Sequence, residues 1–155
     1  MQYGDFYKIV EFNQDVLKKI DNKISDMNLQ IEKSLVNKDS LFGRDPNIRI
    51  SRQAWIKEVS FCNSFLDFGQ KINKVCQWNF DIRSIEAIQY GIYDKGCKYD
   101  WHIDQHFKPL NGSVRKISMT LFMNNPNEYE GGEFDLELYN PCLLYTSPSP
   151  RDSCA

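Results

Sequence analysis

Both histidines of the chain lie within residues 101–106, which read WHIDQH. On an extended strand, residues i and i+2 project from the same face, so His102 and Asp104 would hold an imidazole nitrogen and a carboxylate oxygen side by side. One divalent cation can bridge such a pair, because imidazole and carboxylate are both common metal ligands. An H-x-D tripeptide also arises by chance, and a surface histidine beside an acid is the alternative interpretation.

His106 is not expected to join this pair. It lies on the same strand face as His102 but four residues along, roughly 13 Å away at the ideal rise per residue. Unless the strand bends, that separation is too large for both imidazoles to bind one metal ion. The candidate metal ligands are therefore His102 and Asp104.

The composition is that of one globular domain. The chain has 155 residues, of which 41% are hydrophobic and 26% charged, and 19 basic residues against 21 acidic ones give a formal charge of −2. Because no positive surplus exists to neutralise a phosphate backbone, nucleic-acid binding through charge alone is disfavoured. No apolar stretch approaches the roughly 18 residues of a membrane span. The N-terminus also lacks a signal-peptide pattern, so we expect a cytoplasmic protein with no membrane partner.

Cysteines are scattered along the chain without a C-x-x-C pair, at Cys62, Cys76, Cys97, Cys142 and Cys154. An odd number at such spacings favours reduced thiols over a disulfide framework or a zinc knuckle. A zinc hydrolase is likewise disfavoured, because no further ligand cluster or general base at metal spacing accompanies the His–Asp pair.

The C-terminal residues differ from the rest of the chain in their pattern of polar and apolar residues. Residues 142–152 read CLLYTSPSPRD, with neither strand alternation nor a helical stripe. Every residue of this string matches, in order, the translation of a transposase adapter used in sequencing libraries. We therefore expect residues 142–155 to be a non-native, adapter-derived tail and the biological sequence to end near Pro141.

Two stretches have the periodicity of amphipathic helices. In the first, apolar residues recur three or four positions apart, at Val16, Ile20, Ile24, Met27, Ile31 and Leu35. Asn13 is a suitable N-cap for this helix, and Asp15 complements the helix dipole. The second stripe has Gly69 in its middle and consists of Phe61, Phe65, Phe68, Ile72, Val75 and Cys76.

Alternating patterns predict strands. One is expected near 48–55, and after Trp78 four more are expected over 82–93, 99–106, 114–123 and 133–138, separated by turn-forming residues. Helices first and consecutive strands afterwards predict an α+β fold with an antiparallel sheet or jelly roll, rather than alternating βαβ units.

Further motifs surround the H-x-D pair. Residues 93–104 read YDKGCKYDWHID, residues 115–124 read RKISMTLFMN, and residues 130–134 read EGGEF. This succession resembles the iron(II)- and 2-oxoglutarate-dependent dioxygenases, in particular the prolyl 4-hydroxylase-like branch with the PKHD-type hydroxylases. There, Y-x-x-G-x-x-Y-x-x-H-x-D is followed by R-x-x-[ST], a strand ending in Asn and a Gly-Gly-Glu turn. The resemblance covers roughly residues 49–138.

The resemblance implies an α+β architecture in which N-terminal helices pack on a double-stranded β-helix, a jelly roll or cupin-like fold. Residues 1–80 would form an N-terminal helical support region with a strand near 48–55. Residues 81–141 would form the first part of the dioxygenase jelly-roll core, which would be incomplete at its C-terminus.

The resemblance also implies an activity. Such enzymes bind Fe(II) and couple the oxidative decarboxylation of 2-oxoglutarate by dioxygen to hydroxylation of a C–H bond, with ascorbate supporting turnover in relatives. A facial triad of two histidines and one carboxylate leaves adjacent positions open for both cosubstrates. His102 and Asp104 would be the first two ligands, and Tyr93, Tyr99 and Ser118 would contact 2-oxoglutarate. The sequence does not identify the substrate: a prolyl group, another peptidyl group and a small molecule are all compatible with it.

Individual residues have alternative roles. Tyr93 and Tyr99 can be half-buried strand aromatics, and Ser118 a structural serine. Phe122 stands where several relatives have tyrosine, so a hydroxyl contact to 2-oxoglutarate is absent there. Arg115 is expected to position the strand pair rather than to contact the substrate.

Two elements of the family pattern have no counterpart in the chain. Family members carry a distal histidine followed by a Lys or Arg that pairs with 2-oxoglutarate, but no histidine follows His106. We therefore expect this polypeptide to be a fragment that is inactive or barely active and prone to aggregation. The competing hypothesis is a non-catalytic jelly-roll or cupin-like binding module in which His102 and Asp104 are surface residues.

Overall fold

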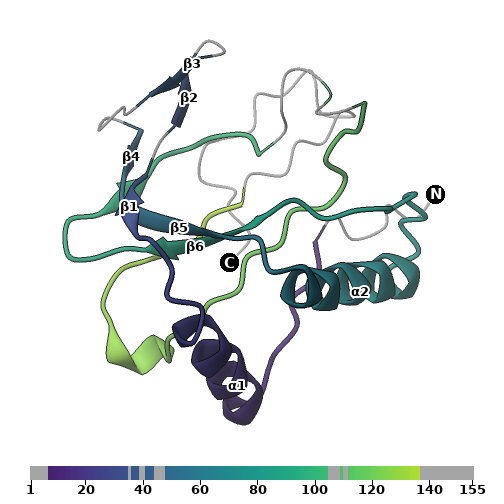
Figure 1. Cartoon of the computed structure of the whole chain (residues 1–155), viewed down its shortest axis with the longest axis horizontal. Helices are drawn as coiled ribbons and strands as arrows, with labels where there is room; N and C mark the ends of the chain where they lie inside the picture. The colour runs from purple at the N-terminus through teal and green to yellow at the C-terminus, as the bar shows by residue number, and fades with distance from the viewer. Residues whose placement is uncertain are drawn as a thin grey trace, which may run out of the picture.

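A computed structural model of the chain describes residues 7–34, 36–38, 41–43, 48–104, 109 and 112–136. The elements follow one another as α1 (Gln14–Ser25), β1 (Glu32–Lys33), β2 (Val36–Lys38), β3 (Leu41–Gly43), β4 (Arg49–Ile50), β5 (Arg52–Ile56), α2 (Val59–Val75), β6 (Ile88–Ile92), β7 (Lys98–Tyr99) and the short 3-10 helix η1 (Pro126–Glu128), as Figure 1 shows. Neither α1 nor α2, the α-helices of the described residues, is long and apolar enough to cross a membrane.

All strand pairs in the described residues are antiparallel. The strand β5 lies between β1 and β6 in a three-stranded sheet, while β2 pairs with β3 and β4 pairs with β7. In the last pair Arg49 lies opposite Tyr99. This register fixes the start of the segment that carries His102 and Asp104.

Local sequence explains where α1 begins, but not where it ends. The side chain of Asn13 accepts a hydrogen bond from the backbone N–H of Val16, 2.9 Å away, which confirms the predicted N-cap. The prediction that the helix continues to Leu35 is wrong, because α1 ends at Ser25 and Asn28 has a φ of 48°. The following residues instead form β1 on the edge of β5. Backbone pairing with a strand distant in sequence thus overrides the helical spacing.

The predicted second helix is confirmed as α2. The carboxylate of Glu58 caps it by accepting hydrogen bonds from the backbone N–H groups of Ser60 and Phe61. The mid-helix Gly69 is buried, and a Cβ built there would lie 3.6 Å from the side chain of Met119. The glycine therefore lies where the segment after residue 112 crosses the helix closely.

The core is small and joins one residue from each of three elements. Ile24 of α1, Ile56 of β5 and Phe61 of α2 are buried together, and the partly buried residues around them are Ile20, Met27, Leu29, Phe65, Ile88 and Tyr90. Both helices lie on one side of β5 and β6 (Figure 1). Burial of these apolar side chains stabilises the packing of the helices against the sheet.

The structure confirms a mixed α and antiparallel β architecture, but several predicted boundaries are wrong. Strands β1 to β5 precede α2, so helices do not simply come first. The strand expected over 82–93 is shortened to Ile88–Ile92, and among the described residues 114–123 and 133–136 form no strand. Alternation predicts an extended backbone, but a strand also needs a partner for its N–H and C=O groups. The complete jelly roll stays a prediction.

Candidate metal centre

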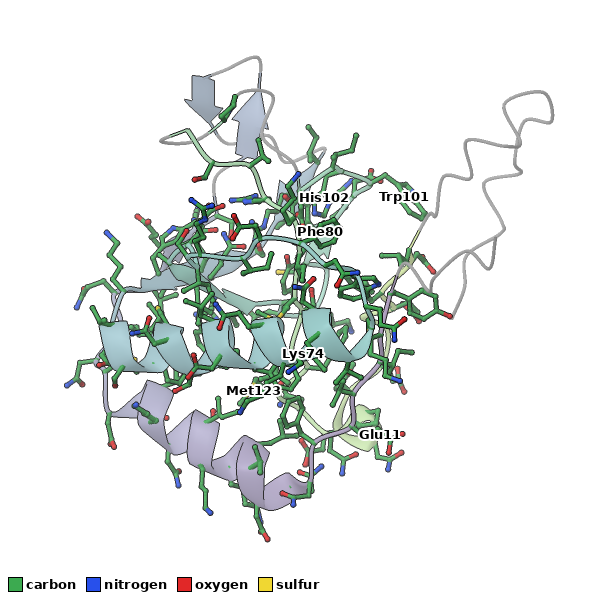
Figure 2. The ribbon with its side chains drawn as sticks, turned by 90° about the vertical axis from the view of Figure 1, so that its right-hand side faces the viewer. Glu11, Lys74, Phe80, Trp101, His102 and Met123 are labelled. Atoms are coloured by element: carbon green, nitrogen blue, oxygen red, sulfur yellow. The ribbon has the colours of Figure 1, made fainter. Side chains whose placement is uncertain are left out.

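The strand β7 leads directly into the candidate ligands. After Tyr99, the N–H of Asp100 donates to the carbonyl oxygen of Ile48 at 2.7 Å, and the chain then leaves the ladder. The strand expected over 99–106 is therefore limited to Lys98–Tyr99, with residues 105–108 outside the described part. Figure 2 shows His102 on the opposite side of α2 from α1. The ligand segment is thus anchored by the sheet and lies away from the first helix.

The two candidate ligands face each other. Nε2 of His102 lies 3.3 Å from Oδ1 of Asp104. When the imidazole is neutral, each residue presents a lone pair there, and two acceptors at this separation repel unless a proton or a cation lies between them. The pair of atoms is thus suited to bind one positive ion.

The second ring nitrogen of His102 is already engaged. Nδ1 lies 2.8 Å from the carbonyl oxygen of Asp100, which can only accept a hydrogen bond, so Nδ1 carries the proton. Metal-binding histidines commonly donate their other N–H to a backbone carbonyl in this way. This contact directs the lone pair of Nε2 toward Asp104.

Asp104 is held at two points by residues of the later segment. Its Oδ2 accepts a hydrogen bond from the hydroxyl of Ser118, and its backbone carbonyl accepts one from Arg115. The Arg115 guanidinium is in turn fixed by two hydrogen bonds of 2.6 Å to the carboxylate of Glu86. The contact with Glu86 raises the pKa of Arg115. Arg115 therefore connects Glu86 with Asp104, although it lies in no strand of the described residues.

Tyr99 lies against the imidazole of His102. The two rings are stacked, with centres 3.6 Å apart and 8° between their planes. The buried guanidinium of Arg49 lies 4.4 Å from the centre of the Tyr99 ring and 5.9 Å from that of Tyr93. Burial is the main cause that raises the pKa of the Tyr99 hydroxyl. Tyr93 is further out, with about half of its surface exposed.

Sequence reasoning did not assign site roles to Arg49 and Glu86. Arg49 donates to Ser51 at 2.8 Å and to Gln89 at 3.0 Å, so its guanidinium is held under Tyr99 by a polar network. The β4–β7 register brings Arg49 opposite Tyr99, and this register cannot be inferred from the sequence pattern. Glu86 lies 29 residues before Arg115, and no local pattern links the two.

The structure unites some of the predicted site residues and leaves others apart. His102, Asp104, Tyr99 and Ser118 form one contact cluster. Within the described ranges, no group of three His, Cys, Asp or Glu side chains gathers where a metal could bind. His106, Pro141 and the tail 142–155 lie outside the described residues.

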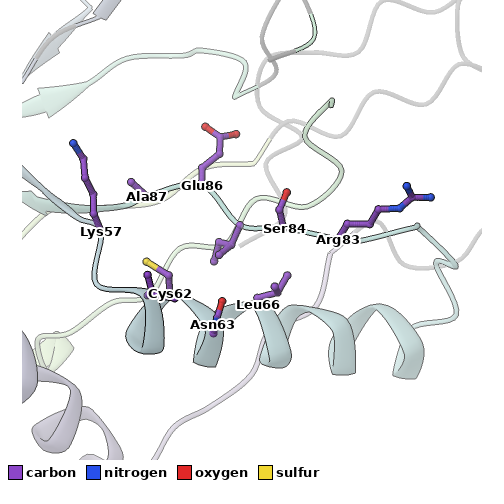
Figure 3. A pocket seen from close by; sticks show the side chains of 10 residues that line it. Lys57, Cys62, Asn63, Leu66, Arg83, Ser84, Glu86 and Ala87 are labelled. Carbon is purple, nitrogen blue, oxygen red and sulfur yellow. The ribbon is translucent and has the colours of Figure 1, made fainter. Parts of the chain in front are cut away.

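A pocket of about 350 Å³ lies between α2 and residues 83–87 (Figure 3). The side chains of Cys62, Asn63 and Leu66 point from the helix toward it, while the carboxylate of Glu86 points away from α2. His102 and Asp104 do not line this pocket. Glu86 connects the two regions, because it lines the pocket and binds Arg115.

Comparison with curated proteins places the chain beside several PKHD-type hydroxylases. It is 39% identical over 63 residues to one from Acaryochloris marina, a match that covers 41% of this chain and 28% of that protein. A PKHD-type hydroxylase of Prochlorococcus marinus is 30% identical over 92 residues, covering 59% and 39%. One from Gluconobacter oxydans is 39% identical over 49 residues, covering 29% and 22%.

The chain thus spans less than two fifths of the length of these relatives. No family model and no solved structure matches it. The names of these relatives agree with the family that the motifs around His102 indicate. Over part of their length, this chain is similar to PKHD-type hydroxylases.

Proposed function

We propose that this chain carries two of the three metal ligands of an Fe(II)- and 2-oxoglutarate-dependent hydroxylase. His102 would supply Nε2 and Asp104 would supply Oδ1. Tyr93 and Tyr99 would lie beside the cosubstrate 2-oxoglutarate, and ascorbate would support turnover. The substrate would be a prolyl or other peptidyl group, or a small molecule, with dioxygen as the second cosubstrate.

The facing pair of acceptor atoms carries this proposal. Nε2 and Oδ1 face each other 3.3 Å apart, as two ligands of one ion would. The remaining atoms, Nδ1 of His102 and Oδ2 of Asp104, are occupied by Asp100 and Ser118. The motif spacing and the hydroxylase relatives support the same function.

The residues of the chain have distinct tasks in this scheme. When bound, Fe(II) would supply the oxidative chemistry that couples decarboxylation of 2-oxoglutarate to hydroxylation. His102 and Asp104 would hold the ion, and the Tyr99 ring would keep the imidazole from rotating. No histidine follows His106 in the sequence. With two protein ligands we expect weak metal binding and turnover close to background.

Metal titration tests the ligand assignment. The polypeptide is titrated with Co(II), a stable substitute for Fe(II), by calorimetry, alongside the variants His102→Ala and Asp104→Ala. Each variant is expected to weaken binding by about tenfold or more, because each removes a ligand. The matched control is His106→Ala, which removes the other histidine and is expected to leave binding unchanged.

One result would contradict the proposed ligands, and another would contradict only the expected low turnover. Co(II) binding that is absent in the wild type, or that survives both ligand variants, would favour the non-catalytic binding module. Robust succinate production from 2-oxoglutarate and added Fe(II) would contradict the expectation of background turnover.

A further inference from the structure

The two oxygens of the Asp104 carboxylate have different partners. Oδ1 faces Nε2 of His102 at 3.3 Å, whereas Oδ2 accepts the hydrogen bond of the Ser118 hydroxyl. The terminal torsion of an aspartate side chain is broad, so a carboxylate without a second contact samples many orientations. Fixing Oδ2 therefore also fixes the direction in which Oδ1 points.

Ser118 comes from a segment that is attached to Asp104 twice. Three residues earlier, Arg115 donates a hydrogen bond to the backbone carbonyl of Asp104 and is itself held by Glu86. The backbone of Asp104 and its carboxylate thus contact Arg115 and Ser118, which are three residues apart in the same segment. The hydroxyl of Ser118 is presented to Oδ2 by an arrangement that Arg115 anchors.

Hydrogen-bond counting limits what Ser118 can do for 2-oxoglutarate. A serine hydroxyl has one proton to donate, and ionised carboxylates can only accept. While that proton is given to Asp104, a carboxylate of 2-oxoglutarate cannot receive it. A cosubstrate contact through this hydroxyl would therefore require breaking the bond to Asp104.

We propose that Ser118 is a positioning residue that holds Asp104 with Oδ1 turned toward Nε2 of His102. This inference rests on the proposed metal site, and it gives Ser118 a task different from the cosubstrate contact implied by the family resemblance. Because the bond is charge-assisted, it is stronger than a bond between neutral groups. Ser118 acts on the metal through Asp104.

The test uses Ser118→Ala and the conservative variant Ser118→Thr. Calorimetric titration with Co(II) gives the dissociation constant of each, and a second titration gives the affinity of the Co(II)-loaded protein for 2-oxoglutarate. We expect Ser118→Ala to weaken Co(II) binding by about tenfold, as loss of an outer contact of a metal ligand commonly does. Ser118→Thr keeps the hydroxyl that donates to Oδ2 of Asp104, so it should retain the wild-type affinity.

Several outcomes would overturn the inference, and they can be told apart. Ser118→Ala with unchanged Co(II) affinity but weaker 2-oxoglutarate binding would make Ser118 a cosubstrate contact. Loss of Co(II) affinity in both Ser118 variants, together with a lowered melting temperature, would indicate a merely structural role. Co(II) binding that does not depend on His102 or Asp104 would refute the proposed function itself. Ser118→Ala that weakens Co(II) binding, with an unchanged melting temperature, supports the positioning role.

Discussion

The imidazole ring of His102 lies parallel to the phenol ring of Tyr99, with their centres 3.6 Å apart. The tyrosine belongs to β7 and is opposite Arg49 in the sheet, so the position of the imidazole is tied to a hydrogen-bonded strand pair. Together with the bond from Nδ1 to Asp100, the stack leaves Nε2 pointing at Asp104. The candidate ligand His102, three residues after Tyr99, is thus held by contacts to β7 and to the backbone of Asp100.

Replacing Tyr99 should weaken metal binding through the lost ring contact. Tyr99→Leu removes the stack, and aromatic pairs are worth about 0.5–1.5 kcal/mol, so Co(II) affinity should fall by about two- to tenfold. Tyr99→Phe retains the ring and should bind Co(II) like the wild type. Calorimetric titration of both variants measures the difference, and wild-type affinity in Tyr99→Leu would show that the stack does not orient His102.

Gly69→Ala should stabilise the protein. Gly69 has no left-handed backbone conformation that would require glycine, and the added Cβ would lie 3.6 Å from the Met119 side chain, an ordinary contact distance. Alanine is favoured over glycine within a helix by about 0.8–1.0 kcal/mol, so the free energy of unfolding should rise by up to that amount. Urea denaturation followed by circular dichroism provides the measurement.

A larger residue at the same position provides the matched comparison. Gly69→Leu would push against Met119 and should lower the free energy of unfolding by about 1–3 kcal/mol. The double variant with Met119→Ala should regain part of that loss, because it vacates the space. If Gly69→Ala lowers the free energy of unfolding, the new methyl group must lie closer than 3.6 Å to the Met119 side chain.

Glu58 should make the stability of α2 depend on pH. Hydrogen bonds from the Ser60 hydroxyl and the Phe61 N–H lower the pKa of its carboxyl below the ordinary value of 4.5. A carboxyl whose pKa is lower in the folded state stabilises that state above its unfolded pKa, and this stabilisation is lost as the pH falls through the folded pKa. The wild type should therefore melt at a higher temperature than Glu58→Gln near pH 7, and the gap should narrow below about pH 4.5.

Melting curves between pH 7 and pH 3 measure that gap. Glu130→Gln, which removes an exposed carboxylate that is not the cap of α2, serves as the control and should follow the wild type across the range. A constant difference between the wild type and Glu58→Gln at every pH would mean that the cap contributes nothing through its charge.

Local patterns in the sequence were sufficient to predict the start of α1, the helix α2 and a strand near 48–55. Asn13 as N-cap acts on the first turn of α1, and the apolar residues from Phe61 to Val75 recur every three or four positions, so the sequence displays both patterns directly. The proximity of His102 and Asp104 is of the same kind, because the two candidate ligands are only two positions apart in the chain.

Tertiary structure decided what those elements contact. The end of α1 at Ser25 depends on β5, whose edge takes up β1 by hydrogen bonding. The contacts that orient Asp104 come from Arg115 and Ser118, 11 and 14 residues away, and the salt bridge that fixes Arg115 spans 29 residues. Such contacts depend on which extended segments lie side by side, and the hydrophobic pattern of each segment is compatible with several neighbours. The sequence by itself thus determined the chemical groups of the candidate site, whereas only chain packing decided which atoms of those groups remain available to a metal.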